Sequence, residues 1–561
     1  MCNTAYSCLV YIWIVMTEAS TYTNIDWAQV KVLIIDDQLS SALLIQNILH
    51  SIDLTAIDIA TNSVNAIRLC KTTAYDLILL DFHLDPQLSG SELLTVMRKN
   101  NYISAYCGII FISGDRTPEV IVTSISLDAD SFLSKPLNIG QLKQRIITVY
   151  QACLIRKPIY IAITNNQTST AIFLCRQLLQ QHGHNLEIEI LLLDLLISQQ
   201  DWLPAQQLLS LFSERSQHHK LGLLQAQLMH KQGDTIAAIQ RLQTLIKQVP
   251  LFVEAYDELA LLLHQQQQPC EAKAIAYQAL MLTPSISQRS LMAAQLAVCT
   301  NDLSLFIKIG KTFVTHLPII NQDWIIYFAQ FTALFEQLHS QQLSPLSQRK
   351  LLKQLKNIHR LAQQRLTSSQ KKHLAAFCHI TLARFAVTNN QPLKAKRRLL
   401  HGLKIYFGQM SQAPAAIMVD ALPLLVYFGE TRLIKEIYQV LMTRSVLDEH
   451  SHHRLSQLQR NKFIIENIRL LVDQLATAKA TISPDPQRAY HIYHTILRDY
   501  PYNTEAHLGR MNSLLVLQQI HHPEIDISLQ QIKKMPLASP LQEWFIQLQQ
   551  LYLDKHSVVY P

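Results

Sequence analysis

Between residues 31 and 150 the chain alternates between two patterns of apolar positions. The run KVLIIDD (31–37) is a short, nearly continuous apolar stretch, which is typical of a strand in a parallel sheet covered on both faces. The next stretch, SSALLIQNILH (40–50), places its leucines and isoleucines at helical spacing. Four more strand–helix pairs follow. Five such pairs predict a doubly wound α/β domain with a five-stranded parallel sheet and right-handed crossovers.

Polar residues end four of these predicted strands. Asp36 and Asp37 follow the first strand, Asp81 the third, Ser113 the fourth, and Lys135 comes just after the fifth. Because the carboxyl ends of parallel strands meet at one edge, where the winding reverses, we expect these side chains to lie close together. Clustered carboxylates repel one another unless a cation neutralises them, and their hard oxygen atoms suit Mg²⁺.

These residue types indicate phosphoryl chemistry. A carboxylate can act as a nucleophile toward phosphorus, and Asp81 stands alone at the end of the central strand, so we expect it to take up a phosphoryl group. Ser113 and Lys135 would contact the phosphoryl oxygens, whose charge the lysine and the metal offset. The expected Mg²⁺ ligands are Asp36, Asp37, Asp81 and the backbone carbonyl of His83.

Four motifs carry a resemblance to a known family: IIDD (34–37), LLDFHLDPQLSGSEL (79–93), FISGD (111–115) and DSFLSKPL (130–137). In this order they resemble the receiver domain of bacterial two-component response regulators, a flavodoxin-like fold. The resemblance implies that a sensor histidine kinase or phosphotransfer protein phosphorylates Asp81, and that the domain is no enzyme beyond Mg²⁺-dependent self-phosphorylation and autodephosphorylation. It also implies a cis bond at Lys135–Pro136, and switch positions at Ser113 and Phe132.

Three features depart from the family pattern. The segment between Asp81 and Gly90 is one residue longer than usual, Phe132 replaces a more common tyrosine, and Asp128 stands where glycine is typical. Asp tolerates a left-handed turn better than most residues. None of the three removes a catalytic atom, so they bear on the size of a conformational switch and not on phosphoryl transfer.

After residue 150 the chain reads as successive amphipathic helices, and a period of 34 residues appears. The spacing separates three pairs: Pro250 and Pro284, Ala226 and Ala260, Ala238 and Ala272. It resembles tetratricopeptide repeats, most clearly at 219–252, 253–286 and 470–503. Such repeats stack into an all-α solenoid whose concave surface binds proteins. We therefore expect an unknown protein partner on these helices, or self-association.

The expected domains are an N-terminal extension (1–28), the receiver (29–153), a connecting segment (154–183) and the repeat region (184–561). Translation is expected to start at Met16. The apolar run 8–16 is too short to span a membrane, which takes about 20 residues, so we expect no membrane span; a small hydrophobic anchor is the alternative.

Composition and charge constrain the function less than the motifs do. The chain is 49% apolar and 16% charged, with a net charge of +8, which is mild for 561 residues. Its nine cysteines are scattered without a C-x-x-C pair, which favours reduced thiols and a cytoplasmic location.

One helical stretch is basic, with Lys350, Lys353, Lys356, Arg360, Arg365, Lys371 and Lys372. Such a run is more often a solvated face, so we do not expect nucleic acid as a partner. Two alternatives stay open: a nucleic-acid-binding regulator that uses these helices, and a constitutive scaffold with a receiver docking module.

Overall fold

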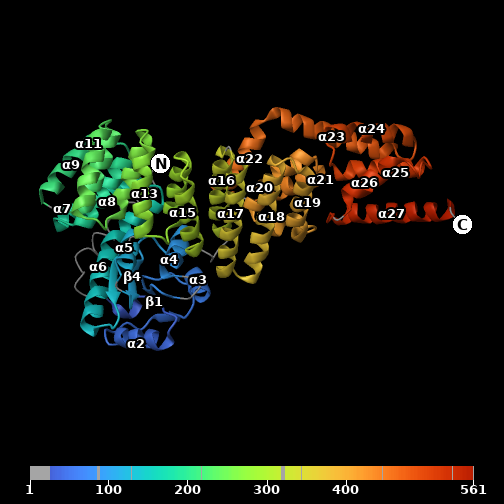
Figure 1. Cartoon of the computed structure of the whole chain (residues 1–561). Coiled ribbons are helices and arrows are strands. Elements are labelled where there is room, and N and C mark those ends of the chain that lie inside the picture. Colours follow the sequence, from blue (N-terminus) through green and yellow to red (C-terminus); the bar gives the residue numbers. More distant parts are fainter. Residues whose placement is uncertain are drawn as a thin grey trace, which may run out of the picture. The chain divides into compact units, whose positions relative to one another are not determined.

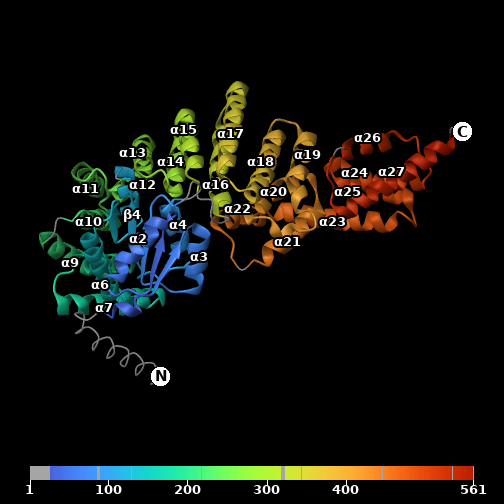
Figure 2. The ribbon, with the colours of Figure 1, turned by 90° about the horizontal axis from the view of Figure 1, so that it is seen from below.

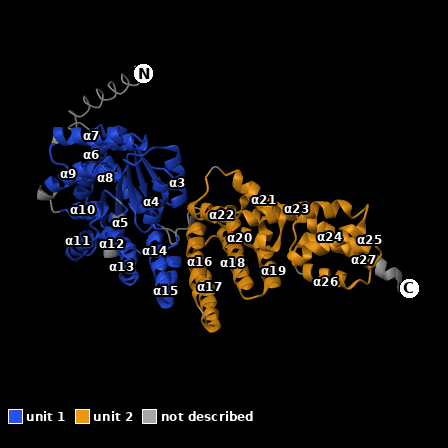
Figure 3. Ribbon diagram, turned by 90° about the horizontal axis from the view of Figure 1, so that it is seen from above, with its two compact units in different colours: residues 1–321 blue, residues 322–561 orange. Residues whose placement is uncertain are grey.

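The computed structural model describes residues 26–84, 89–115, 117–127, 129–215, 218–317, 323–342, 344–444, 446–533 and 535–559. The chain divides into two compact units, residues 1–321 and 322–561 (Figure 3). The expected start at Met16, most of the longer segment before Gly90, and Asp128 lie outside the described residues.

A five-stranded parallel sheet lies near the beginning of unit 1 (Figure 1). The strands are β1 (Val32–Ile35), β2 (Ile57–Ala60), β3 (Leu77–Asp81), β4 (Gly108–Ser113) and β5 (Ser131–Ser134). Their order is β2-β1-β3-β4-β5, and all four neighbouring pairs run parallel. The order reverses direction at β1, which confirms the predicted doubly wound, flavodoxin-like fold.

Helices cover both faces of this sheet (Figure 2). Helices α2 (Leu39–His50) and α6 (Ile139–Thr164) share one hydrophobic core with alternate residues of β1, β3 and β4. Helices α3 (Ser63–Thr72) and α4 (Gly90–Lys99) pack on each other. Because both faces are covered, the central strands β1, β3 and β4 are buried along their whole length, which explains their nearly continuous apolar runs in the sequence.

Helix α6 runs without a break past residue 153, where we expected the receiver to end. Its first half packs into the receiver core through residues such as Ile146 and Cys153, and its second half packs into a separate core through Ile159 and Ala162. Among the described residues it alone has the length and apolar composition to cross a membrane. The two cores that it joins account for its buried apolar positions, among them Ile159 and Ala162.

The rest of unit 1 is helical. Its elements are η1 (Trp27–Gln29), α5 (Pro118–Ser126), α7 (Thr168–His182), α8 (Leu186–Ser198), α9 (Trp202–Arg215), α10 (His219–Lys231), α11 (Thr235–Gln248), α12 (Val253–Gln265), α13 (Pro269–Leu282), α14 (Ser287–Cys299) and α15 (Leu303–Thr315). Helices α10 and α11 form one hairpin and α12 and α13 the next, so both 34-residue segments are helix–turn–helix units. The alanines that recur with this period are 0–1% exposed and let the paired helices approach closely.

Unit 2 contains α16 (Asp323–Gln341), α17 (Pro345–Arg365), α18 (Ser368–Thr388), α19 (Pro392–Leu403), η2 (Lys404–Tyr406), η3 (Met410–Gln412), α20 (Ala415–Phe428), α21 (Thr431–Met442), α22 (Glu449–Arg460), α23 (Lys462–Thr481), α24 (Pro486–Asp499), α25 (Thr504–Val516), α26 (Pro523–Ile532) and α27 (Ser539–Val559). Helices α18 and α19 pack against each other, as do α24 and α25. The third predicted repeat, 470–503, spans the second half of α23 and all of α24.

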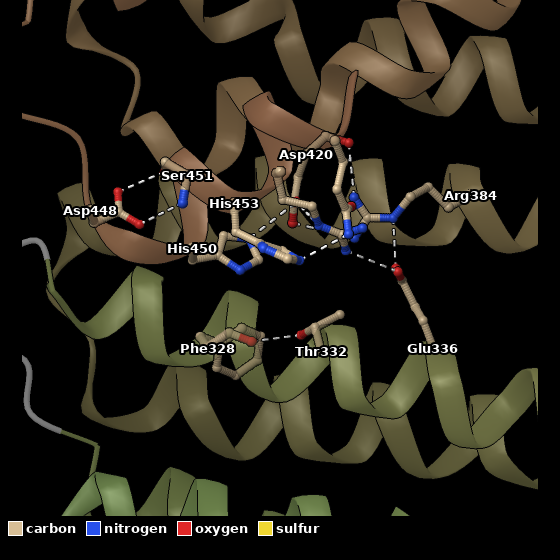
Figure 4. A network of polar contacts seen from close by, with 11 residues as sticks. Phe328, Thr332, Glu336, Arg384, Asp420, Asp448, His450, Ser451 and His453 are labelled. Atoms are coloured by element: carbon tan, nitrogen blue, oxygen red, sulfur yellow. Dashed lines mark hydrogen bonds and ion pairs between the residues drawn. The ribbon is translucent and has the colours of Figure 1, made fainter. Parts of the chain in front are cut away.

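A buried charged network joins four helices of unit 2 (Figure 4). The carboxylate of Asp420, on α20, is fully buried and lies 3.4 Å from Arg384 Nη2, 3.3 Å from Arg454 Nε and 3.2 Å from His450 Nε2. Arg384 also donates to Glu336 Oε1 at 2.6 Å and to the backbone carbonyl of Asp420 at 2.8 Å. Burial raises the pKa of Asp420, but the neighbouring cations outweigh it and lower that pKa to about 2.

We expect Asp420→Asn to destabilise unit 2. The change keeps the side-chain shape but leaves two partly buried guanidinium groups short of a counter-charge at a fully buried position, which costs up to about 3–5 kcal/mol. Chemical unfolding followed by circular dichroism would measure the loss, with exposed Asp473→Asn on α23 as the control. A loss equal to that of the control would contradict the assignment.

The difference between wild type and Asp420→Asn has a defined pH dependence. Because the folded-state pKa of Asp420 is depressed, its contribution is complete above the unfolded-state pKa of about 3.9. We therefore expect the difference to shrink as pH falls from that value toward about 2. A difference that stays constant across this range would mean that the carboxylate charge is not its source.

Candidate functional site

Three strands bring charged side chains together at the carboxyl edge of the sheet. Asp36 follows β1, Asp81 is the last residue of β3, and Lys135 comes directly after β5. The ammonium of Lys135 lies between the two carboxylates, 2.8 Å from Asp36 Oδ2 and 2.6 Å from Asp81 Oδ2. Residues separated by 99 and 54 positions in the chain therefore form one contact group.

Asp36 is held by the start of α2. Its Oδ1 accepts a hydrogen bond from the backbone N–H of Gln38 at 3.0 Å, and its Oδ2 accepts one from the hydroxyl of Ser41 at 2.5 Å. Asp36 is 1% exposed as a residue, whereas the adjacent Asp37 is exposed. The two acids therefore differ: one is fixed by the protein, and the other keeps its oxygen atoms available.

Asp81 is held by the loop that follows it and by the start of α4. Its Oδ1 accepts a hydrogen bond from the backbone N–H of His83 at 3.0 Å. A Cβ at Gly90 would lie 2.1 Å from the backbone oxygen of Asp81, so only glycine lets α4 begin this close to the site. A capping box between Ser89 and Glu92 fixes that helix end.

Burial and hydrogen bonding shift the pKa values of Asp81 and Lys135 in opposite directions. Burial raises the pKa of Asp81, and the nearby Asp36 adds to this, while the hydrogen bonds from Lys135 and from the backbone of His83 act in the other direction; the net shift is upward. Burial lowers the pKa of Lys135, but its hydrogen bonds to the two carboxylates outweigh this and raise it. Burial thus outweighs the favourable contacts at Asp81, whereas the contacts with the two carboxylates outweigh burial at Lys135.

The acidic residues fit a hard divalent cation. Asp36, Asp37 and Asp81 each offer a carboxylate oxygen, and these atoms lie within 4.8 Å of one another. All three are hard oxygen ligands, and one of the acids is exposed toward solvent, as suits Mg²⁺, which keeps several of its waters. This acidic group is typical of the Mg²⁺ site of a receiver domain.

The other predicted residues lie around this centre. Ser113 ends β4, is fully buried, and its hydroxyl oxygen accepts a hydrogen bond from the backbone N–H of Asp115 at 3.0 Å. Phe132 is half-buried on β5, paired in register with Phe111 on β4. The Lys135–Pro136 peptide bond is cis.

Three contributors to the geometry of the site were not predicted from the sequence. The hydroxyl of Ser41 holds Asp36, and nothing in its sequence context distinguishes it from other helix serines. The ring of His83 lies 3.3 Å from the carboxylate of Asp115, a contact across 32 residues that no spacing predicts. The capping box at 89–92 was legible as the pattern S-x-x-E before an apolar run.

Comparisons with known proteins agree with this geometry. Residues 32–147 match the family model of the response regulator receiver domain. The chain is 30% identical over 125 residues to a probable chemotaxis protein CheY from Rhizobium etli, covering 22% of this chain and 95% of that protein. It is 32% identical over 116 residues to the transcriptional regulatory protein SpaR from Bacillus subtilis, covering 21% of this chain and 50% of that protein.

Solved structures match over the same share of the chain. A CheY-like receiver domain protein from Methanospirillum hungatei is 23% identical, with a TM-score of 0.21, covering 22% of this chain and 95% of that one. A two-component response regulator from Clostridium difficile is 27% identical, with a TM-score of 0.20, covering 22% and 97%. Through residues 32–147, which a long helical region follows, the chain belongs to the response regulator receiver family.

Proposed function

We propose that this protein is a two-component response regulator that takes up a phosphoryl group on Asp81 and transmits its state through the helical region. The observation that carries the proposal is the convergence of three carboxylates and one ammonium at the carboxyl edge of the sheet. A sensor histidine kinase or a phosphotransfer protein supplies the phosphoryl group.

The site residues take separate roles in this reaction. A carboxylate oxygen of Asp81 attacks phosphorus, so that an O–P bond forms while the P–N bond to the donor histidine breaks. When bound to Asp36, Asp37, Asp81 and the His83 carbonyl, Mg²⁺ would offset the charge of the phosphoryl oxygens. Lys135, already 2.6 Å from Asp81, supplies a further positive charge. The Ser113 hydroxyl would move to contact a phosphoryl oxygen, and the Phe132 ring would follow that movement.

Helix α5 offers the route from the site to the helices. It follows β4 by a short loop, and Val122 on α5 is 1% exposed because it packs with Val253, Tyr256 and Ala279 of the α12–α13 hairpin. A displacement of Ser113 at the end of β4 therefore reaches the hairpin through one intervening helix. This contact favours a switched output over a constitutive scaffold.

A second contact ties the receiver to the helical region. The guanidinium of Arg156, on α6, pairs with Asp130 just before β5 and lies 3.3 Å from Glu187 on α8. Asp130 also accepts a hydrogen bond from the backbone N–H of Ile109 on β4. The strands beside the site are thus anchored to helices beyond the receiver.

We propose that the tetratricopeptide-like hairpins at 219–286 bind a protein partner in response to phosphorylation of Asp81.

We expect Asp81→Asn to abolish phosphoryl uptake, because an amide is a poor nucleophile toward phosphorus. Incubation with a small phosphoryl donor and Mg²⁺, followed by intact-protein mass spectrometry, measures the uptake. Asp53→Asn is the matched control, since Asp53 has a positive φ that Asn also adopts. Uptake by Asp81→Asn equal to that of the control would refute the assignment of the phosphoacceptor.

Mg²⁺ is expected to stabilise the folded receiver. Binding relieves carboxylate repulsion, and a cation at 100 times its Kd adds about 2.7 kcal/mol. Thermal unfolding with and without MgCl₂ measures the gain in stability. Asp37→Asn should reduce this gain, while the hydrogen bonds that hold Asp36 stay intact. An equal gain in wild type and in Asp37→Asn would show that the ion binds elsewhere.

Val122→Asp should loosen the α12–α13 hairpin. The change removes about 1.5–3 kcal/mol of apolar burial and places a charge in the contact. Hydrogen exchange of residues 253–282 should become at least tenfold faster, whereas Ile125→Asp, at a position that is 52% exposed on the same helix, should leave it unchanged. A beryllofluoride adduct of the wild type should shift exchange in the same segment; no shift would mean that α5 does not relay the signal.

A further inference from the structure

The charges of this chain are unevenly divided between its two units. Residues 322–561 contain 28 Lys and Arg against 16 Asp and Glu, a net charge of +12, while residues 1–321 carry 21 against 25, a net charge of −4. Between Glu336 and Asp420 there is no acidic residue at all, and this stretch holds 14 Lys and Arg. The net charge of +8 for the whole chain therefore includes one strongly basic segment, between Glu336 and Asp420.

Helix α17 presents part of this charge on a single face. Its buried side consists of Leu351, Leu355, Ile358 and Ala362, which repeat at helical spacing. On the opposite side Arg349, Lys353, Lys356 and Arg360 are all exposed, at intervals of four, three and four residues. At 1.5 Å rise per residue these four cations form a stripe about 16 Å long.

The stripe continues onto the next helix of unit 2. Helix α18 begins at Ser368, three residues after α17 ends, and its first turns carry the exposed Lys371 and Lys372. Figure 3 shows α16, α17 and α18 next to one another in unit 2. The hairpin turn therefore adds two cations near the end of the stripe that Arg360 occupies.

Within the part of the chain that the structure describes, no carboxylate lies within ion-pair distance of Lys353, Lys356 or Arg360. Two basic residues elsewhere in unit 2, by contrast, are paired: Lys396 with Glu430 at 2.6 Å, and Arg432 with Glu505 at 3.1 Å. Cations kept free on one face, with no acid nearby in sequence, point to an external polyanion.

The structure narrows the type of polyanion. Because the apolar side of α17 is buried in unit 2, this helix cannot lay an apolar face into a membrane as interfacial helices do. A stripe of about 16 Å spans roughly five nucleotides of one strand, at about 3.4 Å each. The neighbouring positions are amides, Gln354 and Asn357, which hydrogen-bond to phosphate and sugar without adding negative charge.

We propose that the exposed face of α17, extended by Lys371 and Lys372, binds the phosphate backbone of a nucleic-acid duplex. The contact is to the backbone and so reads no base sequence by itself. It is independent of the receiver chemistry, and it assigns a nucleic-acid ligand to unit 2, for which our sequence analysis favoured a protein partner and left nucleic acid as an alternative.

The test is binding of fluorescein-labelled duplex DNA and duplex RNA to the full chain, measured by fluorescence anisotropy across a KCl series. The triple variant Lys353→Gln/Lys356→Gln/Arg360→Gln should bind at least tenfold more weakly than wild type. The slope of log K against log salt should fall by about 2.7, at about 0.9 per lost contact. Gln is a good helix former and all three positions are exposed, so α17 should stay folded.

The matched control is Arg460→Gln/Lys462→Gln/Arg469→Gln, which removes the same charge from exposed positions of α22 and α23 in the same unit. It should bind like wild type. Equal weakening in both triple variants, or no binding by wild type, would overturn the proposal; so would binding to polyglutamate or anionic vesicles in place of the duplexes. As a second measurement on wild type, duplex should protect Lys353 and Lys356 from acetylation, and unprotected lysines would contradict the site.

Discussion

The ammonium of Lys135 between the carboxylates of Asp36 and Asp81 is the interaction on which the receiver site depends. It joins the carboxyl ends of β1, β3 and β5, so three strands meet in one charged contact. Parallel strands place their ends at the same edge, and this crowds acids that would otherwise repel one another. Burial, with a smaller contribution from Asp36, raises the pKa of Asp81. The three carboxylates Asp36, Asp37 and Asp81 outnumber the one ammonium, and this surplus of negative charge suits a divalent cation.

The receiver is not packed as an isolated domain. Helix α6 belongs to the receiver core over its first half and to a helical core over its second half. Helix α5 contributes Val122 to a cluster with α12 and α13, and Arg156 pairs with Asp130 beside β5. Each contact buries atoms that a free receiver would expose. The receiver therefore shares its packing with helices that lie far along the chain.

Charged residues of unit 2 are paired in its interior and exposed to solvent on the surface of α17. In the interior, Asp420 and Glu336 compensate Arg384 and Arg454, because an unpaired charge away from water is costly. On the surface of α17, Lys353, Lys356 and Arg360 have no carboxylate within ion-pair distance among the described residues, and they face solvent. The same residue types thus serve as internal structure in one place and as an open electrostatic surface in another.

The sequence by itself determined the fold of the receiver and the order of its acids. Short apolar runs alternating with helical periods fix a doubly wound sheet, and that topology brings Asp36, Asp37 and Asp81 to one edge. The 34-residue spacing of alanines likewise predicted the α10–α11 and α12–α13 hairpins, because small residues are needed at each close helix crossing.

Only the tertiary structure decided which elements touch and which charges are paired. The stretch 158–163 is apolar throughout, and a short apolar run does not distinguish strand from helix, so the continuity of α6 appears only in three dimensions. The contact of Val122 with Tyr256, the hydrogen bond from Ser41 to Asp36, and the burial of Asp420 join residues with no periodic relation. A local sequence pattern indicates which face of a helix or strand is apolar, but not which other element packs against that face.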